Sequence, residues 1–244
     1  MKCWPRPGLC WSDRVGVVPG IVAGVRERGG FWVGLFASVF YPFTWALSRR
    51  TLRGAEHLPK RGGALLVLNH PSYIDPIIDA IFVHEQGRVP RFFTKHTLWN
   101  IPFLRRVLDG AGQIPVFRGT AKAGDSLRGA HDALKVGRVV VIYPEGTLTQ
   151  DPDGWPLDYR TGVARLALAN DVPVIPAARW GTREIFDSRR RRFRPFPRKP
   201  VNMVIGAPMD LSDYRGREVD GELLREVTDV IMDRVRELLK ELRA

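Results

Sequence analysis

The sequence predicts an α/β fold: a mixed, largely parallel sheet covered by helices on its faces, preceded by an N-terminal membrane-associating helical segment. Three observations predict it. The chain has 244 residues and is 44% hydrophobic, which is enough for one sizeable core. From Leu52 onward, short β-rich runs alternate with helical stretches, as they do in sheets that helices cover. Before them stands a long uncharged segment, Phe31–Leu47.

The N-terminal segment Phe31–Leu47 has seventeen residues, carries no charge and is flanked by arginines on both sides. A spanning helix needs about 20 apolar residues, and Pro42 interrupts this run. We therefore expect a helix that lies in one leaflet as a monotopic anchor. An ordinary core helix is the alternative. We place an anchoring segment at residues 1–50 and a catalytic domain at residues 51–244.

Six short runs rich in β-branched and aromatic residues predict the strands of the sheet. They are Ala64–Leu68, Arg91–Lys95, Gln113–Phe117, Val139–Tyr143, Val172–Arg179 and Val201–Gly206. A helix is expected at Asp125–Val136, because a capping residue opens it and Gly137 closes it. Apolar residues between Leu224 and Leu242 recur at three- and four-residue steps, which predicts an amphipathic C-terminal helix.

Polar residues follow three of the predicted strands. His70 and Asp75 come after the first, Arg118 after the third and Glu145 after the fourth. In α/β sheets, reactive groups collect at the carboxyl ends of strands. If these strands are neighbours, an imidazole, two carboxylates and a guanidinium converge on one edge of the sheet.

His70 and Asp75 have the residue types and the spacing of a general base and its partner. Asp75 can accept the second ring proton of His70, which fixes the tautomer and stabilises the imidazolium. Such a base takes a proton from an alcohol and contributes ~10²–10⁴-fold in rate. A serine-nucleophile triad is disfavoured, because no G-x-S-x-G motif is present and Ser72 is two residues from His70. The remaining histidines are interpreted as structural: His57, His84, His96 and His131.

The charge of the chain is strongly positive, with a formal net charge of +12. Such a charge implies attraction to nucleic acid, anionic lipid or phosphorylated substrates. Ser188–Pro200 holds seven basic residues and no acidic one. It is either a solvated loop or a surface that meets phosphate head groups, with Phe193 and Phe196 beside the charges.

The cysteines and acidic residues do not predict a metal site. Cys3 and Cys10 have the spacing of neither a zinc knuckle nor a C-x-x-C redox pair, and two cysteines make no disulfide framework. Histidines, cysteines and carboxylates do not gather elsewhere at metal-ligand spacing. We expect no metal and a reducing cytoplasmic environment.

Four blocks of the chain together resemble the glycerolipid acyltransferases, in particular the bacterial 1-acyl-sn-glycerol-3-phosphate acyltransferase group. Asn69–Asp75 (NHPSYID) is similar to the H-x₄-D motif of that family. Gly112–Gly119 (GQIPVFRG), Tyr143–Thr147 (YPEGT) and Val172–Ala178 (VPVIPAA) resemble its second, third and fourth blocks, in family order. A single H-x₄-D is a weak signal, whereas four blocks in order are a specific one.

The resemblance implies a reaction and a set of roles. A fatty acyl group passes from acyl-CoA or acyl carrier protein to the free sn-2 hydroxyl of lysophosphatidate, giving phosphatidate. His70 is then the general base and Asp75 its orienting partner. Arg118 binds the acceptor phosphate, for which a guanidinium fork is well suited, and Lys95 is a second phosphate ligand.

Further roles follow from the third and fourth blocks of the resemblance. Glu145 and Gly146 shape the acceptor site, with Thr147 as a helper. The family often has a basic residue after E-G-T, where this chain has Leu148; Arg160 is the candidate for a compensating charge. The fourth block lines the acyl-chain or thioester region.

The same resemblance implies the partners and the location. The expected partners are the lysophosphatidate acceptor, the acyl thioester donor and an anionic membrane surface, with no cofactor and no nucleic acid. We expect a peripheral or monotopic protein at the cytoplasmic face of the cell membrane. One alternative is the same chemistry on glycerol 3-phosphate or another lysolipid, and the other is a non-catalytic basic module that binds membrane or RNA. Nothing in the sequence indicates an oligomeric state.

Overall fold

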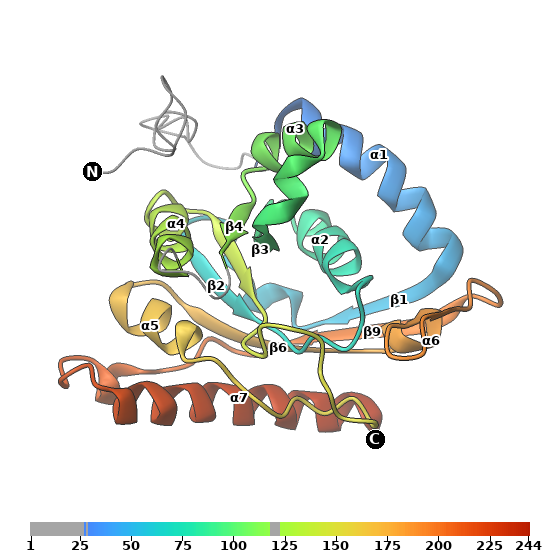
Figure 1. Cartoon of the computed structure of the whole chain (residues 1–244). Coiled ribbons are helices and arrows are strands. Elements are labelled where there is room, and N and C mark those ends of the chain that lie inside the picture. The colour runs from blue at the N-terminus through green and yellow to red at the C-terminus, as the bar shows by residue number, and fades with distance from the viewer. Residues whose placement is uncertain (1–26, 28, 118–122) are drawn as a thin grey trace.

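The structure is a computed structural model that describes residues 27, 29–117 and 123–244. Within these ranges, seven strands form one sheet in the order β1-β9-β6-β2-β5-β3-β4 (Figure 1). Neighbouring strands run parallel except for the β6–β9 pair, which is antiparallel. In sheet order the strands are β1 (Ser48–Arg53), β9 (Lys199–Ile205), β6 (Val174–Trp180), β2 (Ala64–Val67), β5 (Val139–Ile142), β3 (Pro90–Lys95) and β4 (Ile114–Val116). The predicted mixed, largely parallel sheet is confirmed.

Helices cover both faces of this sheet (Figure 1). The α-helices are α1 (Gly30–Leu47), α2 (Asp75–Glu85), α3 (Pro102–Gly110), α4 (Ala123–Lys135), α5 (Gly162–Ala169), α6 (Thr182–Ile185) and α7 (Gly221–Arg243). Short 3₁₀ helices are η2 (Ala55–His57), η3 (His96–Asn100) and η4 (Ser212–Tyr214). A hairpin of β7 (Phe186–Asp187) and β8 (Arg192–Phe193) stands apart from the main sheet.

The central strand β2 separates two apolar cores, one on each face of the sheet. Leu65 and Val67 pack with residues of α4, α5 and α7, whereas Leu66 packs with residues of α2 on the opposite face. The alternation follows from the two-residue period of a strand. Because helices cover both faces, every residue of β2 is apolar and buried.

Helix α1 lies on the outside of the α2 face and contacts α2 and α3. It is long and apolar enough to cross a membrane by length and composition alone. Few of its residues are nevertheless buried, and exposed ones include Phe31, Val39, Phe43 and Trp45, which a core helix would bury. The chain continues from α1 straight into β1, so the boundary expected between residues 50 and 51 falls inside a strand of the main sheet.

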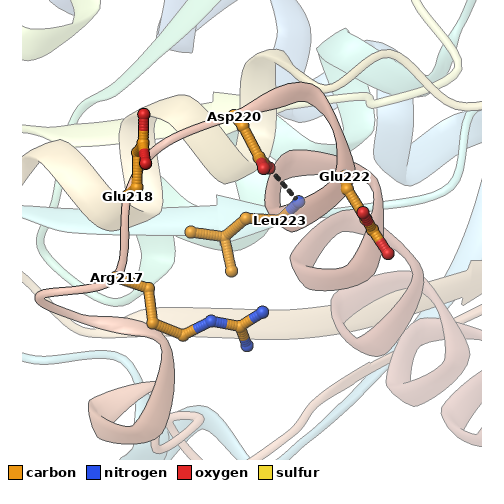
Figure 2. Close-up of a pocket in the computed structure, with 5 residues that line it drawn as sticks. All are labelled: Arg217, Glu218, Asp220, Glu222 and Leu223. Carbon is orange, nitrogen blue, oxygen red and sulfur yellow. Dashed lines mark hydrogen bonds between the residues drawn. The ribbon is translucent and has the colours of Figure 1, made fainter.

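A pocket lies at the N-terminus of α7, and Figure 2 shows its lining. Asp220 caps this helix, because its Oδ1 accepts a 2.8 Å hydrogen bond from the backbone N–H of Leu223. The other lining residues are Arg217, Glu218 and Glu222. None of the residues predicted for the active site lines this pocket.

Candidate active site

The strand ends that carry His70 and Glu145 lie side by side. β2 and β5 are parallel neighbours, and Val67 is paired with Ile142. His70 and Glu145 each stand three residues beyond that pair, so the two chains leave the sheet at the same level. The backbone N–H of His70 donates a 2.9 Å hydrogen bond to Oε1 of Glu145. For these two strands, the expected convergence on one edge of the sheet is found.

His70 and Asp75 form the contact that their spacing predicts. Asp75 is the first residue of α2 and is fully buried. Its Oδ2 lies 3.0 Å from Nδ1 of His70 and accepts a 2.6 Å hydrogen bond from the backbone N–H of Ser72. Since Nδ1 donates to the carboxylate, Nε2 is the nitrogen that can take a proton from a substrate.

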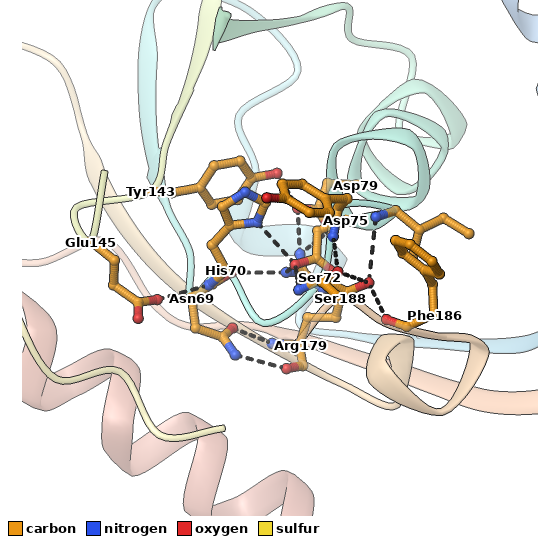
Figure 3. A network of polar contacts seen from close by, with 12 residues as sticks. Asn69, His70, Ser72, Asp75, Asp79, Tyr143, Glu145, Arg179, Phe186 and Ser188 are labelled. Carbon is orange, nitrogen blue, oxygen red and sulfur yellow. Dashed lines mark hydrogen bonds and ion pairs between the residues drawn. The ribbon is translucent and has the colours of Figure 1, made fainter. Parts of the chain in front are cut away.

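Arg179, the residue that follows the fourth block, belongs to the site although the sequence analysis did not single it out. Its side chain is fully buried, and its Nη2 lies 2.8 Å from Oδ2 of Asp75 (Figure 3). Burial alone raises the pKa of Asp75, but the charge of Arg179 and the hydrogen bond with His70 outweigh it and hold that pKa below its usual range. Asp75 is therefore a carboxylate at neutral pH, as an acceptor for Nδ1–H has to be.

One face of the His70 ring is covered by Tyr143, the first residue of the Y-P-E-G-T block. The two rings are stacked, with centroids 4.3 Å apart and planes 11° from parallel. The hydroxyl of Tyr143 donates a 2.6 Å hydrogen bond to Oδ2 of Asp79, which is also paired with Arg179. Burial raises the pKa of Tyr143 well above its ordinary value, so the phenol stays a hydrogen-bond donor.

Asn69 joins the end of β2 to β6. Its side-chain amide pairs with the main chain of Arg179: Nδ2 donates to the carbonyl oxygen at 3.0 Å, and Oδ1 accepts from the backbone N–H at 2.9 Å. Nη2 of Arg179 also donates to the backbone oxygen of Asn69 at 2.8 Å. These bonds extend the contact between the two strands past their last ladder pair and fix the residue that precedes His70.

The turn after β5 holds Glu145 and Gly146, the two residues expected to shape the acceptor site. Glu145 is buried, and this burial raises the pKa of its carboxyl group. Gly146 has φ +66°, the left-handed region that favours glycine. Thr147 is exposed at the surface of the turn.

Arg160 lies against this turn, fourteen residues after Gly146 in the sequence. Its backbone N–H donates to the oxygen of Pro144 at 2.8 Å, and a Cβ on Gly146 would lie 3.4 Å from its Cγ. Leu148, by contrast, is buried. The backbone and the Cγ of Arg160 therefore lie at the turn that lacks the family's usual basic residue, on a neighbouring segment.

Lys95 and Arg118 are the two residues predicted to bind the acceptor phosphate. Lys95 is exposed at the end of β3, which is the neighbour of β5. Arg118 lies outside the described residues. The strand before it, β4, is at the edge of the sheet and is separated from β2 by β5 and β3, about 14 Å at the usual spacing between strands. The assumption that the first and third predicted strands are neighbours is wrong, and the strand before Arg118 does not end beside His70.

Other polar groups near the site have structural contacts. The hydroxyl of Ser72 donates to the backbone oxygen of Phe186 at 2.7 Å, away from His70 (Figure 3). Nδ1 of His57 and of His84 lie 2.9 Å from a backbone oxygen and from the Tyr41 hydroxyl, respectively. In the part of the chain that the structure describes, no group of three or more histidine, cysteine and acidic side chains could hold a metal ion.

Comparison with known proteins adds an independent observation to this geometry. A family model described as Acyltransferase matches residues 49–180, which is more than half of the chain. The chain belongs to the acyltransferase family. The matched range includes all the residues described above as contacting His70 or Asp75, from Asn69 to Arg179.

Several named relatives are similar to this acyltransferase. A 1-acyl-sn-glycerol-3-phosphate acyltransferase of Borreliella burgdorferi is 28% identical over 134 residues, which are 54% of this chain and 52% of that protein. The chloroplastic enzyme BAT2 of Brassica napus, of the same name, is 28% identical over 66% of this chain and 44% of its own length. The chain thus spans about half the length of these curated relatives.

A solved structure is similar over more of the chain. The 1-acyl-sn-glycerophosphate acyltransferase PlsC from Thermotoga maritima matches 84% of this chain and 79% of its own with a TM-score of 0.64 and 27% identity. The match spans most of both chains, in keeping with membership of the family.

Proposed function

We propose that this acyltransferase moves a fatty acyl group from a thioester donor to the sn-2 hydroxyl of lysophosphatidate, giving phosphatidate. The observation that carries the proposal is the His70–Asp75 pair at the end of β2, with Nδ1 bound to a buried carboxylate. The named activity of the relatives supports the choice of acceptor.

The chemistry follows from the orientation of the imidazole. Nε2 of His70 takes the proton of the sn-2 hydroxyl as the hydroxyl oxygen attacks the thioester carbonyl carbon. The tetrahedral intermediate then collapses, the C–S bond breaks, and the thiolate leaves with the proton that His70 carried. Asp75 stabilises the imidazolium between these two steps.

The acceptor phosphate is proposed to meet a set of cations at this edge of the sheet. Arg118 is the main ligand by its resemblance to the second block, and Lys95 assists it from the end of β3. Arg160 adds a charge at the Gly146 turn, where Leu148 is buried and offers none. Glu145 and Gly146 shape the acceptor site, and the hydroxyl of Thr147 is within the same exposed turn.

The enzyme is proposed to work as a peripheral or monotopic protein on the cytoplasmic face of the cell membrane. The exposed aromatic residues of α1 and the basic Ser188–Pro200 segment lie next to each other, because the guanidinium of Arg198 stands 4.6 Å from the centre of the Trp45 ring. Phe196 is 72% exposed within the basic segment. Apolar burial and charge attraction together hold a protein at a membrane where either alone is weak.

A matrix of acceptors and donors tests this proposal with purified protein. The acceptors are lysophosphatidate, glycerol 3-phosphate and an uncharged lysolipid, each offered with acyl-CoA and with acyl carrier protein. We expect phosphatidate from lysophosphatidate at the highest kcat/KM, and a rate at least about 100-fold lower for His70→Ala. Faster transfer to glycerol 3-phosphate would replace the proposed acceptor, and no transfer to any acceptor would remove the enzymatic proposal.

A further inference from the structure

Five side chains, that of His70 among them, form a closed ring of contacts (Figure 3). Nδ1 of His70 lies 3.0 Å from Asp75, Asp75 is paired with Arg179 at 2.8 Å, and Arg179 is paired with Asp79. Asp79 accepts the hydrogen bond of Tyr143 at 2.6 Å, and the Tyr143 ring stacks back on His70 at 4.3 Å. The ring starts and ends at the imidazole.

The members of this ring come from four separate parts of the fold. Asp75 and Asp79 are one turn apart on α2 and face the same side of that helix. Arg179 reaches them from β6, while His70 and Tyr143 follow β2 and β5. Assembling such a set requires the finished sheet, so the ring is a product of the tertiary fold.

The charges of the ring depend on Arg179. Asp75, Asp79 and Arg179 are all fully buried, and two buried carboxylates one turn apart would repel each other. The guanidinium of Arg179 forms an ion pair with each carboxylate: Nη2 pairs with Asp75, and Nη1 pairs with Asp79. A lysine would bring one point charge to two carboxylates and could not keep this geometry.

The ring acts on His70 from two directions. Through Asp75 it fixes the nitrogen that carries the proton, and through the Tyr143 stack it fixes the plane of the imidazole. Asp75 Oδ2 is itself held by Arg179 and by the Ser72 backbone N–H at 2.6 Å. Fixed orientation matters for rate, because a displacement of about 1 Å at a reacting group can cost about 100-fold.

We propose that Arg179 is a positioning residue of the acyltransferase reaction, and that Asp79 and Tyr143 hold it in place. Arg179 orients His70 through Asp75 and contacts neither substrate. The inference rests on the proposed function for the reaction that it serves.

The test uses a charge-balanced double variant, Arg179→Gln with Asp79→Asn. It removes one positive and one negative charge, so the net charge of the buried cluster is unchanged. We expect a folded protein whose kcat falls by about 100-fold, with the KM of acceptor and donor within twofold of wild type. The single variant Arg179→Lys, which keeps the charge, should also lower kcat with little change in KM. It replaces the double variant in this test if the double variant does not fold.

Arg88 provides the matched control. It is another buried arginine, and its Nη2 donates to the backbone oxygens of Gly62 and Gly137 at 2.7 and 2.8 Å. It has no contact with the ring. Arg88→Gln should lower the melting temperature and leave kcat unchanged below that temperature. A folded Arg179 variant with wild-type kcat would overturn the proposal.

Proton NMR separates a failure of this inference from a failure of the proposed function. The Nδ1–H proton of His70, identified by its loss in His70→Ala, should give a downfield signal in wild type and in Arg88→Gln. We expect the signal to be lost or shifted in Arg179→Gln/Asp79→Asn. If wild type transfers no acyl group while the signal behaves as expected, only the proposed function fails. An unchanged signal in the double variant contradicts the positioning role whatever the activity.

Discussion

The backbone N–H of His70 donates a 2.9 Å hydrogen bond to Oε1 of Glu145, 75 residues further along the chain. This bond ties the end of β2 to the turn after β5. The return contact runs from the Thr149 backbone N–H to the His70 oxygen at 3.0 Å. The backbone N–H and the backbone oxygen of His70 are thus both held by the segment Glu145–Thr149.

The first prediction separates the two roles of Glu145, accepting a hydrogen bond and carrying a charge. Glu145→Gln keeps the acceptor oxygen, whereas Glu145→Ala leaves the N–H of His70 without it. An unpartnered buried donor costs about 1–3 kcal/mol, so the alanine variant should be less stable by that amount and slower. Chemical denaturation and steady-state rates measure both. Equal stability of the alanine variant and wild type would show that the bond contributes nothing.

The pH dependence of Glu145→Gln has a definite sign. Burial raises the pKa of Glu145, so at neutral pH the ionised carboxyl destabilises the folded state relative to the unfolded one. This penalty disappears as pH falls from above the raised value to below the ordinary one of 4.5. Glu145→Gln should therefore gain stability over wild type at pH 7–8, and the gain should shrink toward pH 4. A gain that grows at acid pH would contradict the assignment.

The second prediction concerns Asp75→Asn. The amide favours the wrong tautomer of His70, and kcat should fall by on the order of 10⁴. The Asn side chain also leaves Arg179 with one carboxylate fewer, which should destabilise the fold by about 3–5 kcal/mol. Because the pKa of Asp75 is held below 3.8, this stability difference should be present above pH 3.8 and narrow below it. The control is Asp171→Asn, an exposed aspartate paired with Arg215, which should change neither quantity.

The third prediction concerns the acceptor. Arg160→Gln should raise the KM for lysophosphatidate at least about tenfold, as the loss of one charge-assisted hydrogen bond implies. The KM for the thioester and kcat should stay near wild type. Arg165→Gln, an exposed arginine one turn into α5, is the control. An unchanged acceptor KM in Arg160→Gln would remove this residue from the phosphate site.

The fourth prediction concerns the membrane and uses point variants, because a deletion to residue 50 would cut β1. Phe31→Ser/Val39→Ser alters exposed apolar residues of α1, and Arg190→Gln/Arg192→Gln alters exposed charges of the basic segment. Charge attraction is screened over a Debye length of about 8 Å at physiological salt, whereas apolar burial is not. Sedimentation with anionic vesicles should be weaker at all salt concentrations for the first variant and weaker only at low salt for the second.

Two results would contradict that prediction. If the α1 variant sediments like wild type at high salt, α1 is not an anchor. If the arginine variant sediments like wild type at low salt, the basic segment does not bind the anionic lipid. Vesicles of neutral lipid are the control for charge attraction between the basic segment and the membrane.

The site was predictable from the sequence where neighbouring residues carry the signal. His70 and Asp75 are five residues apart, so the turn into α2 brings them together without help from distant elements. Glu145 could be placed beside them because its strand, like the first, ends in polar residues, and parallel strands share an edge. The Asp75–Glu85 helix itself is not among the helices that the sequence predicts.

Arg179 could not be found in this way. It follows the apolar run of β6 as the last residue of the predicted strand, where an arginine is usually solvent-exposed. Its burial depends on Asp75 and Asp79 of α2, which pack on the same region only in the finished fold. The signal that could have pointed to it is the pair of aspartates one turn apart on an otherwise apolar helix, because two such carboxylates need a buried cation.

The position of β4, the strand before Arg118, shows the limit of reasoning from strand order in the sequence. The order of strands in the sheet differs from their order along the chain: β4 pairs with β3 at the edge, and β5 inserts between β3 and β2. Crossover connections set that order, and short apolar runs carry no information about it.

The measurement that tests the central claim most directly is the rate of phosphatidate formation by purified wild type and by His70→Ala. Both are assayed with lysophosphatidate and acyl-CoA, and circular dichroism and thermal melting confirm that the variant is folded. The account predicts that wild type forms phosphatidate and that His70→Ala loses at least about 100-fold in rate, the lower range for a general base. A folded His70→Ala protein with near-normal turnover would contradict it.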